Sequence, residues 1–188
     1  LKPKKQFNRD GNAFRIVYAG KFAPLWGTRE MLSTFKGLRE KGINVELHVY
    51  GDKIHNPPED KYFKSEIEKA LQNTEGLIWH KAKPREQVIE AMKYYDLAWG
   101  WRRPELEENT DEVSTKFLEY SSVGLPVIVI NNKITTKLLT KDYPLFVDSF
   151  EKLIPTIESI ITNPQSLKHA SSLVYKASKM FSFSAIRA

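Results

Sequence analysis

Residues 14–20 have the sequence Phe-Arg-Ile-Val-Tyr-Ala-Gly, a short run of apolar, β-branched and aromatic side chains that ends in glycine. Such a run predicts a buried β-strand. The next periodic stretch begins at Thr28, which is placed to cap a helix that Gly42 would end. The apolar residues that fall on one face of this helix are Met31, Leu32, Phe35 and Leu38. A strand followed by an amphipathic helix is the repeating unit of an α/β fold.

The same alternation continues along the chain. Further strands are expected at residues 45–50, 76–80, 96–101, 126–130 and 145–147. Helices are expected through Ile67 and Leu71, from Pro84, over residues 114–123 and 135–139, and in one or two segments that end near Met180. About six strands alternating with helices predict a Rossmann-like α/β fold, an open parallel sheet with helices on both faces. In such a sheet, ligands bind beyond the carboxyl ends of the strands.

The length and composition of the chain fit one domain of an ordinary soluble protein. The chain has 188 residues, of which 41% are hydrophobic and 28% are charged. We expect a single domain over residues 1–188, with flexible ends at 1–12 and 181–188. The longest apolar stretch, near residues 125–130, is too short to cross a bilayer, and no segment resembles a signal peptide.

Several kinds of chemistry are disfavoured by the composition. The chain has no cysteine, which excludes a disulfide scaffold and a thiol nucleophile and fits a cytoplasmic protein. His48, His55, His80 and His169 lack metal-ligand spacing, and no Asp-x-Asp occurs, so we expect no metal site. The acidic run at 105–108 is expected to be a solvated loop rather than a cation site.

The formal net charge is +6. A soluble, lysine-rich surface is the simplest interpretation, and attraction to an anionic partner is the alternative. No aromatic-basic strand and no zinc-finger spacing supports nucleic acid, so we expect none as a partner. An anionic membrane surface remains compatible with the charge, and it would place the protein at the inner face of the membrane.

The loop between the first strand and its helix is the first candidate ligand site. Gly20 and Gly27 allow close backbone approach, and the helix start beyond them offers unpaired N–H groups to an anion. Lys21 could meet a phosphate as a point charge. A glycine-bounded turn with a solvated lysine is an equally good interpretation. The spacing disfavours a dinucleotide or P-loop site, because neither glycine motif is present.

Residues 111–128 form the second and stronger candidate. They have the sequence Asp-Glu-Val-Ser-Thr-Lys-Phe-Leu-Glu-Tyr-Ser-Ser-Val-Gly-Leu-Pro-Val-Ile. Ser114 is a natural N-cap, so Ser114, Thr115 and Lys116 would surround a helix start with hydroxyls, amides and one ammonium group, a suitable seat for a diphosphate.

Glu119 follows Lys116 by three residues and would share its helix face. Its carboxylate could accept hydrogen bonds from a ribose diol, whereas an ion pair with Lys116 on a solvated face is the simpler interpretation. Asp111 or Glu112, just before the helix, could bind hydroxyls of a sugar beyond the phosphates. The direct run of the helix into the strand at 126–130 favours the ligand-binding interpretation, because it fixes the helix start at the carboxyl edge of the sheet.

These blocks resemble the retaining glycosyltransferases of family 4, the group 1 transferases. That family carries an acidic residue, seven intervening residues and a glutamate, then a small-residue helix and Gly-x-Pro-Val. Asp111, Glu119 and residues 124–127 match this pattern. Residues 17–21, Gly27, 48–52 and 95–97 resemble the family's upstream segments, so the likeness covers roughly residues 14–180. Trp26 stands where the family usually has a second basic residue.

The resemblance implies a role for each matching residue. Lys21 would contact the donor diphosphate, Glu119 would bind the ribose, and Asp111 or Glu112 would bind the transferred sugar. The base would lie near Gly51 and the loop at 80–83. The implied donor-binding set is Gly20, Lys21, Gly51, Lys81, Ser114, Thr115, Lys116 and Glu119, and the candidate catalytic residues are Asp111, Glu112 and Glu119.

The resemblance also implies one half of a GT-B fold, the donor-binding C-terminal domain of an enzyme whose N-terminal acceptor domain is absent from this chain. The expected ligand is a nucleoside-diphosphate sugar used as donor substrate, with no tightly bound cofactor. The expected activity is retaining hexosyl transfer in surface polysaccharide or glycan synthesis, onto an acceptor that is often lipid-linked, and this domain alone is expected to be inactive. The alternatives are half of a nucleotide-sugar epimerase and a non-catalytic binding or regulatory module of flavodoxin-like topology.

Overall fold

The computed structural model describes residues 12–107 and 112–181. Five parallel strands form one sheet in the order β3-β2-β1-β4-β5. The strands are β1 (Phe14–Ala19), β2 (Val45–Tyr50), β3 (Leu77–Trp79), β4 (Leu97–Trp99) and β5 (Val127–Ile128). The expected open parallel α/β sheet is confirmed. Its order is that of a Rossmann sheet and differs from the flavodoxin-like order, which removes that topology as an alternative.

The sixth strand expected at residues 145–147 is reduced to one isolated bridge between Val129 and Phe146. Only two ladder bonds form there: Val129 N–H donates to the Leu145 carbonyl at 3.1 Å, and Val147 N–H donates to the Val129 carbonyl at 2.9 Å. Pro144 precedes this segment and has no N–H to extend the ladder. The neighbouring strand β5 is also only two residues long, so the described sheet has five strands rather than about six.

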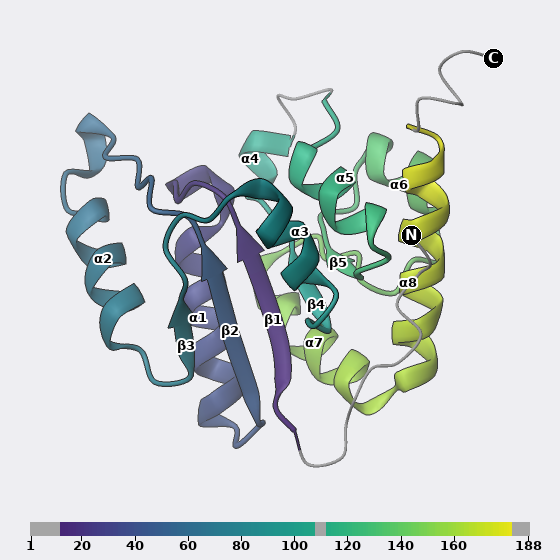
Figure 1. Ribbon diagram of the computed structural model, residues 1–188, viewed down its shortest axis with the longest axis horizontal. Coiled ribbons are helices and arrows are strands. Elements are labelled where there is room, and N and C mark those ends of the chain that lie inside the picture. The colour runs from purple at the N-terminus through teal and green to yellow at the C-terminus, as the bar shows by residue number, and fades with distance from the viewer. Residues whose placement is uncertain (1–11, 108–111, 182–188) are drawn as a thin grey trace.

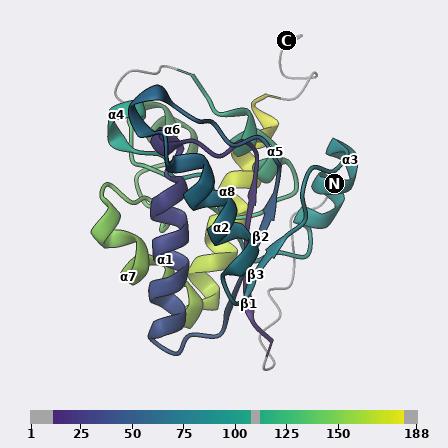
Figure 2. The ribbon, with the colours of Figure 1, turned by 90° about the vertical axis from the view of Figure 1, so that its left-hand side faces the viewer.

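Helices cover both faces of the sheet (Figures 1 and 2), as predicted. The helices are α1 (Thr28–Glu40), α2 (Phe63–Asn73), α3 (Arg85–Met92), α4 (Pro104–Glu107), α5 (Thr115–Ser122), α6 (Lys133–Leu139), α7 (Leu153–Thr162) and α8 (Pro164–Lys179). In Figure 2, α1 lies on one side of β1 and β2, and α3 lies on the other. Right-handed crossovers require this arrangement, because the chain moves outward from β1 to β3 and then returns past β1 to β4.

The start of α1 corrects one prediction. Gly27, with a φ of +68°, is the residue that precedes the helix, and Thr28 is its first helical residue. The Thr28 hydroxyl instead donates to the Ala23 carbonyl at 2.9 Å and accepts from the Ala23 N–H at 3.1 Å. Thr28 therefore closes the loop of residues 23–28 and does not cap the helix.

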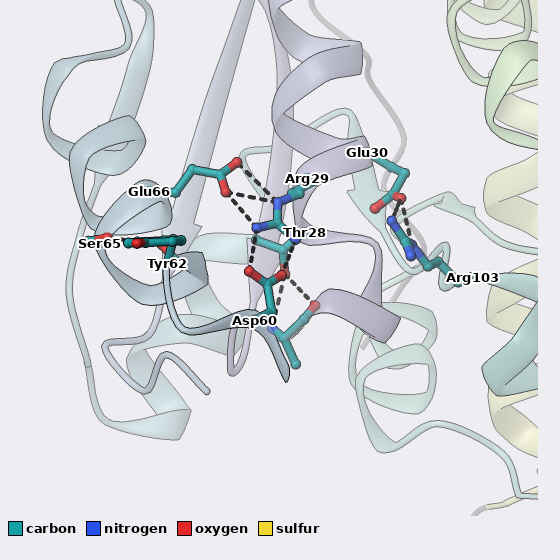
Figure 3. Close-up of polar contacts among 9 residues, drawn as sticks. Thr28, Arg29, Glu30, Asp60, Tyr62, Ser65, Glu66 and Arg103 are labelled. Atoms are coloured by element: carbon teal, nitrogen blue, oxygen red, sulfur yellow. Dashed lines mark hydrogen bonds and ion pairs between the residues drawn. The ribbon is translucent and has the colours of Figure 1, made fainter. Parts of the chain in front are cut away.

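Ion pairs fix both sides of the first turn of α1 (Figure 3). Arg29 bonds to Asp60 and to Glu66 of α2, each with a shortest distance of 2.6 Å. On the other side, Glu30 accepts from Arg103, in the loop after β4, at 2.6 Å. These contacts tie the start of α1 to α2, to the segment between β2 and α2, and to the loop after β4. No described helix is both long and apolar enough to cross a membrane.

Candidate functional site

The carboxyl edge between β1 and β4 is the place where the chain switches from one half of the sheet to the other. Loops after neighbouring strands diverge at such a point and leave a crevice. Two pockets lie there. One has a volume of about 210 Å³ and is lined by Tyr18, Trp26, Arg102, Ser114, Thr115 and Lys116 among others. The other has a volume of about 230 Å³ and is lined by Gly20, Tyr50, Gly51, Lys83, Arg85 and Glu119 among others. They are called the Lys116 pocket and the Glu119 pocket below.

Lys116 projects from the first turn of α5 and is held between two aromatic rings. Its ammonium group donates to the Tyr18 hydroxyl at 2.9 Å. The Lys116 nitrogen lies 4.4 Å from the centre of the Tyr18 ring and 4.3 Å from that of Trp26. Both distances allow cation–π attraction. The side chain also crosses the backbone of Gly20, where an added Cβ would lie 2.3 Å from Lys116 Cε. Gly20 is therefore required for the position of this lysine.

Burial, together with the nearby charges of Arg102 and Lys21, lowers the pKa of Lys116 from its ordinary value to about 7, while the charge of Glu119 opposes the shift. Burial penalises the charged form of a lysine, and like charges add to that penalty. The negative charge of an incoming anion would offset both effects, because it favours the charged form of the lysine. The Lys116 pocket is thus electrostatically prepared for a phosphate or a carboxylate.

The start of α5 lines the same pocket. Ser114 occupies the N-cap position, as predicted, but its side chain makes no capping hydrogen bond. The first N–H groups of a helix have no partner within the helix itself. The Ser114 hydroxyl, the Thr115 hydroxyl and these N–H groups are therefore available to oxygen atoms of a ligand.

Glu119 is paired with a residue that the sequence did not suggest. Its Oε1 accepts from Arg85 Nε, in the first turn of α3, at 2.7 Å. The expected alternative, an ion pair with Lys116 on a solvated face, is not observed. The Arg85 side chain is 71% exposed, whereas that of Glu119 is 25% exposed. An exposed arginine contributes little as a counterion, so Glu119 is positioned to accept further hydrogen bonds inside its pocket.

Gly20 and Gly51 meet where β1 and β2 end. A Cβ on Gly51 would lie 2.2 Å from the Gly20 carbonyl oxygen, and Gly51 has a φ of +129°. Gly51 N–H donates to the Lys81 carbonyl at 2.9 Å, and the Gly51 carbonyl accepts from Trp79 Nε1 at 2.8 Å. This close backbone approach forms the floor of the Glu119 pocket and leaves no room for a side chain.

The other predicted residues lie at the margins or outside the description. The Lys21 side chain is exposed and lines a separate apolar pocket beside Leu25. The Lys81 ammonium lies 2.9 Å from the centre of the Trp79 ring, and the Lys81 side chain does not line the Glu119 pocket. Glu112 is exposed and lines the Lys116 pocket. Asp111 lies outside the described residues.

A buried hydrogen-bond network beside the Lys116 pocket was not predicted from the sequence. The acidic run at 105–108 was expected to be a solvated loop. Its described part, residues 105–107, instead belongs to α4, and Glu107 is buried, while residue 108 lies outside the described residues. Glu107 accepts one hydrogen bond from Arg102 Nε and another from Asn132 Nδ2 at 2.6 Å. Arg102 follows β4 by three residues, and that position at the carboxyl edge was the only signal the sequence offered.

Histidine and tyrosine rings stack beneath the Glu119 pocket. His48 bonds to Glu46 at 3.2 Å and to His80 at 3.0 Å, so both ring nitrogens of His48 have a hydrogen-bond partner. The Tyr50 ring stacks on His80 with their centres 4.4 Å apart. Burial lowers the pKa of both histidines, so each is neutral above pH 7. Among the described residues, no three His, Asp or Glu side chains are grouped to hold a metal ion.

Comparison with known proteins gives one family. The family model described as "Glycosyl transferases group 1" matches residues 2–180. No curated protein sequence matches the chain. The solved structures that resemble it include a mutant of TarM from S. aureus in complex with fondaparinux, alpha-GlcNAc-glycerol and UDP. Alr3699/HepE of Anabaena in complex with UDP and glucose and the C-terminal domain of LpcC, a group 1 family protein of Francisella tularensis, are also similar.

The likeness to these structures lies in the fold. The TM-scores are 0.70, 0.70 and 0.68, and the sequence identities are 10%, 12% and 12%, respectively. The matches cover 97%, 90% and 89% of this chain. They cover only 36% of the TarM chain and 44% of the HepE chain, but 85% of the LpcC domain. The five-stranded unit described above thus corresponds to one half of a GT-B fold.

Proposed function

The chain belongs to the group 1 glycosyl transferases, and from this membership and its carboxyl-edge geometry we propose that it binds a nucleoside-diphosphate-sugar donor. The observation that carries the proposal is the arrangement on either side of Gly20. Lys116 crosses Gly20 and lines one pocket, while Glu119 and Gly51 line the other together with Gly20. A nucleoside diphosphate has the matching chemistry, because its diphosphate is anionic and the ribose attached to it carries a diol.

The parts of the donor are assigned accordingly. The diphosphate would contact Lys116, the hydroxyls of Ser114 and Thr115 and the first N–H groups of α5. The ribose would bind Glu119, with the base between Gly51 and the loop at 80–83. The TarM structure contains UDP and the HepE structure contains UDP and glucose. Because these proteins share the fold, UDP is the first nucleotide to test.

In the complete enzyme this diphosphate-binding site would stabilise the leaving group. Preorganised donors and a cation stabilise the charge that develops on the diphosphate as the bond to the sugar breaks. Asp111 or Glu112 would bind the transferred sugar, and a second domain would bind the acceptor. We propose retaining transfer in the synthesis of a surface glycan, at the inner face of an anionic membrane that the lysine-rich surface suits. The proposed chemistry needs no resident cofactor.

Calorimetric titration with UDP, GDP and ADP tests the donor site. Glu119→Ala should weaken binding of the preferred nucleotide at least tenfold and abolish its preference over the 2′-deoxy form, because the ribose diol loses its acceptor. Glu158→Ala is the matched control: Glu158 is 31% exposed and paired with Lys41 on the other side of the molecule. No binding to any of the three nucleotides would reject the donor site. Unchanged discrimination against the deoxy form in Glu119→Ala would reject the role of Glu119 alone.

A further inference from the structure

A second cation, Arg102, lines the Lys116 pocket. Its side chain is only 21% exposed. The charge of Arg102 is close enough to lower the pKa of Lys116. Two cations that face one small pocket repel each other, so the folded protein maintains an arrangement that is unfavourable when the pocket is empty. An anion placed between them would remove that repulsion.

Hydrogen bonds on the side away from the pocket fix the orientation of Arg102. Its Nε donates to Glu107, whose side chain is 7% exposed and also accepts from Asn132 at 2.6 Å. Asn132 in turn caps α6 by accepting from the N–H groups of Ile134 and Thr135. A buried carboxylate with two such partners holds the guanidinium in one orientation. Ordering this arginine therefore requires little further loss of side-chain entropy when a ligand binds.

The bond to Glu107 uses one end of the guanidinium group. Arginine has five N–H donors in a planar fork, and Nε supplies one of them. Within residues 12–107 and 112–181, the terminal Nη groups of Arg102 have no hydrogen-bond partner. A planar pair of N–H groups is the geometry that binds phosphate oxygens through two parallel hydrogen bonds. Glu112, which also lines the pocket, is exposed and offers no buried counter-charge to Arg102.

We infer that Arg102 is the second phosphate-binding residue of this site, and that Glu107 and Asn132 are positioning residues that hold its guanidinium toward the pocket. The inference rests on the proposed donor site and extends it, because it assigns the diphosphate two cations from two different segments of the chain. Lys116 supplies a point charge from the start of α5. Arg102 supplies a bidentate fork from the loop after β4. The acidic run at 105–108 gains a function in this way: Glu107 orients a ligand-binding arginine.

Calorimetry on the full chain with matched ligands tests the inference. Arg102→Gln should weaken binding of UDP, or of GDP or ADP if one of them is preferred, about 10- to 100-fold. Binding of the corresponding free nucleoside should stay within twofold, which separates loss of a phosphate contact from general damage to the pocket. Arg39→Gln is the matched control, because Arg39 is 31% exposed, is paired with Glu75 and does not line the pocket. Arg39→Gln should change neither affinity more than twofold.

Glu107→Gln tests the positioning role. It should weaken diphosphate binding several-fold in the wild-type background and have no further effect in the Arg102→Gln background, because Glu107 acts through Arg102. Arg102→Lys, which keeps the charge and loses the fork, should give an intermediate loss and serves as the second variant if Arg102→Gln does not fold. Equal affinity of wild-type and Arg102→Gln protein for the diphosphate would overturn the inference while leaving the donor site intact. Failure of the wild-type protein to bind any of the three diphosphates would overturn both.

Discussion

The affinity of the site for a nucleoside diphosphate should fall steeply as the pH rises above 7. In the empty pocket, burial lowers the pKa of Lys116 to about 7. A bound diphosphate would favour the charged form and return this pKa toward its ordinary value of 10.5. The folded, empty protein therefore loses the Lys116 proton as the pH passes 7, and binding at higher pH must take that proton up again. Each such proton uptake reduces the apparent affinity.

The size of the effect follows from that pKa. With an empty-state pKa of about 7, the apparent Kd should scale as one plus ten to the power of the pH minus 7. It should therefore rise roughly 50-fold between pH 7 and pH 9. The tyrosines and histidines near the pocket do not change charge in this range. Burial raises the pKa of Tyr18 and Tyr120, so both stay protonated, whereas His48 and His80 are already neutral. The terminal phosphate of the nucleotide titrates near pH 6, below the range used.

Calorimetry at pH 7, 8 and 9 measures both consequences. Repeating the pH 8 titration in two buffers of different ionisation enthalpy should reveal the uptake of about one proton per nucleotide bound. Lys116→Met should bind more weakly at pH 7 and show a flat profile above it. Lys41→Met, which removes a lysine paired with Glu158, should keep the wild-type slope. A flat wild-type profile from pH 7 to 9, or an unchanged slope in Lys116→Met, would refute the reasoning.

Two further predictions concern stability. Gly51→Ala should lower the free energy of unfolding by roughly 2–4 kcal/mol in urea denaturation, because its Cβ would lie 2.2 Å from the Gly20 carbonyl oxygen at a φ of +129°. Gly42→Ala, at a φ of +77° with no atom within 4 Å of the added Cβ, should cost only about 1 kcal/mol, and equal losses would contradict the steric argument. Tyr143→Phe should cost about 1–3 kcal/mol, since the Tyr143 hydroxyl satisfies both the N–H and the carbonyl of Val127 at 2.9 and 2.7 Å. The exposed Tyr62→Phe should change stability by less than about 0.5 kcal/mol in the same assay, and a similar loss in both variants would argue against the role of those two bonds.

The sequence predicted the site best where local pattern and position in the sheet coincide. The helix that begins after Ser114 runs into β5 after a short turn, so its start had to lie at the carboxyl edge. Gly20 and Gly51 end adjacent strands, and the parallel register of β1 and β2 brings them together, as Ala19 opposite Tyr50 shows. The roles assigned to Lys21, Lys81 and Asp111 remain predictions.

The sequence by itself determined the alternation of strands and helices. The spacing of apolar residues and the positions of glycines are local properties of the chain, and burial of the apolar faces in the core stabilises the elements that they predict. The sequence also determined that Glu119 and Lys116 lie on a helix that begins at the carboxyl edge of the sheet. Only the tertiary structure decided their partners. Lys116 bonds to Tyr18 across 98 residues of sequence, and Glu119 to Arg85 across 34. The Arg102–Glu107–Asn132 chain likewise joins two loops and depends on β4 and β5 lying side by side. Hydrogen bonds and charge pairs between distant segments leave no periodic trace in the sequence, so they become visible only when the fold brings the segments together.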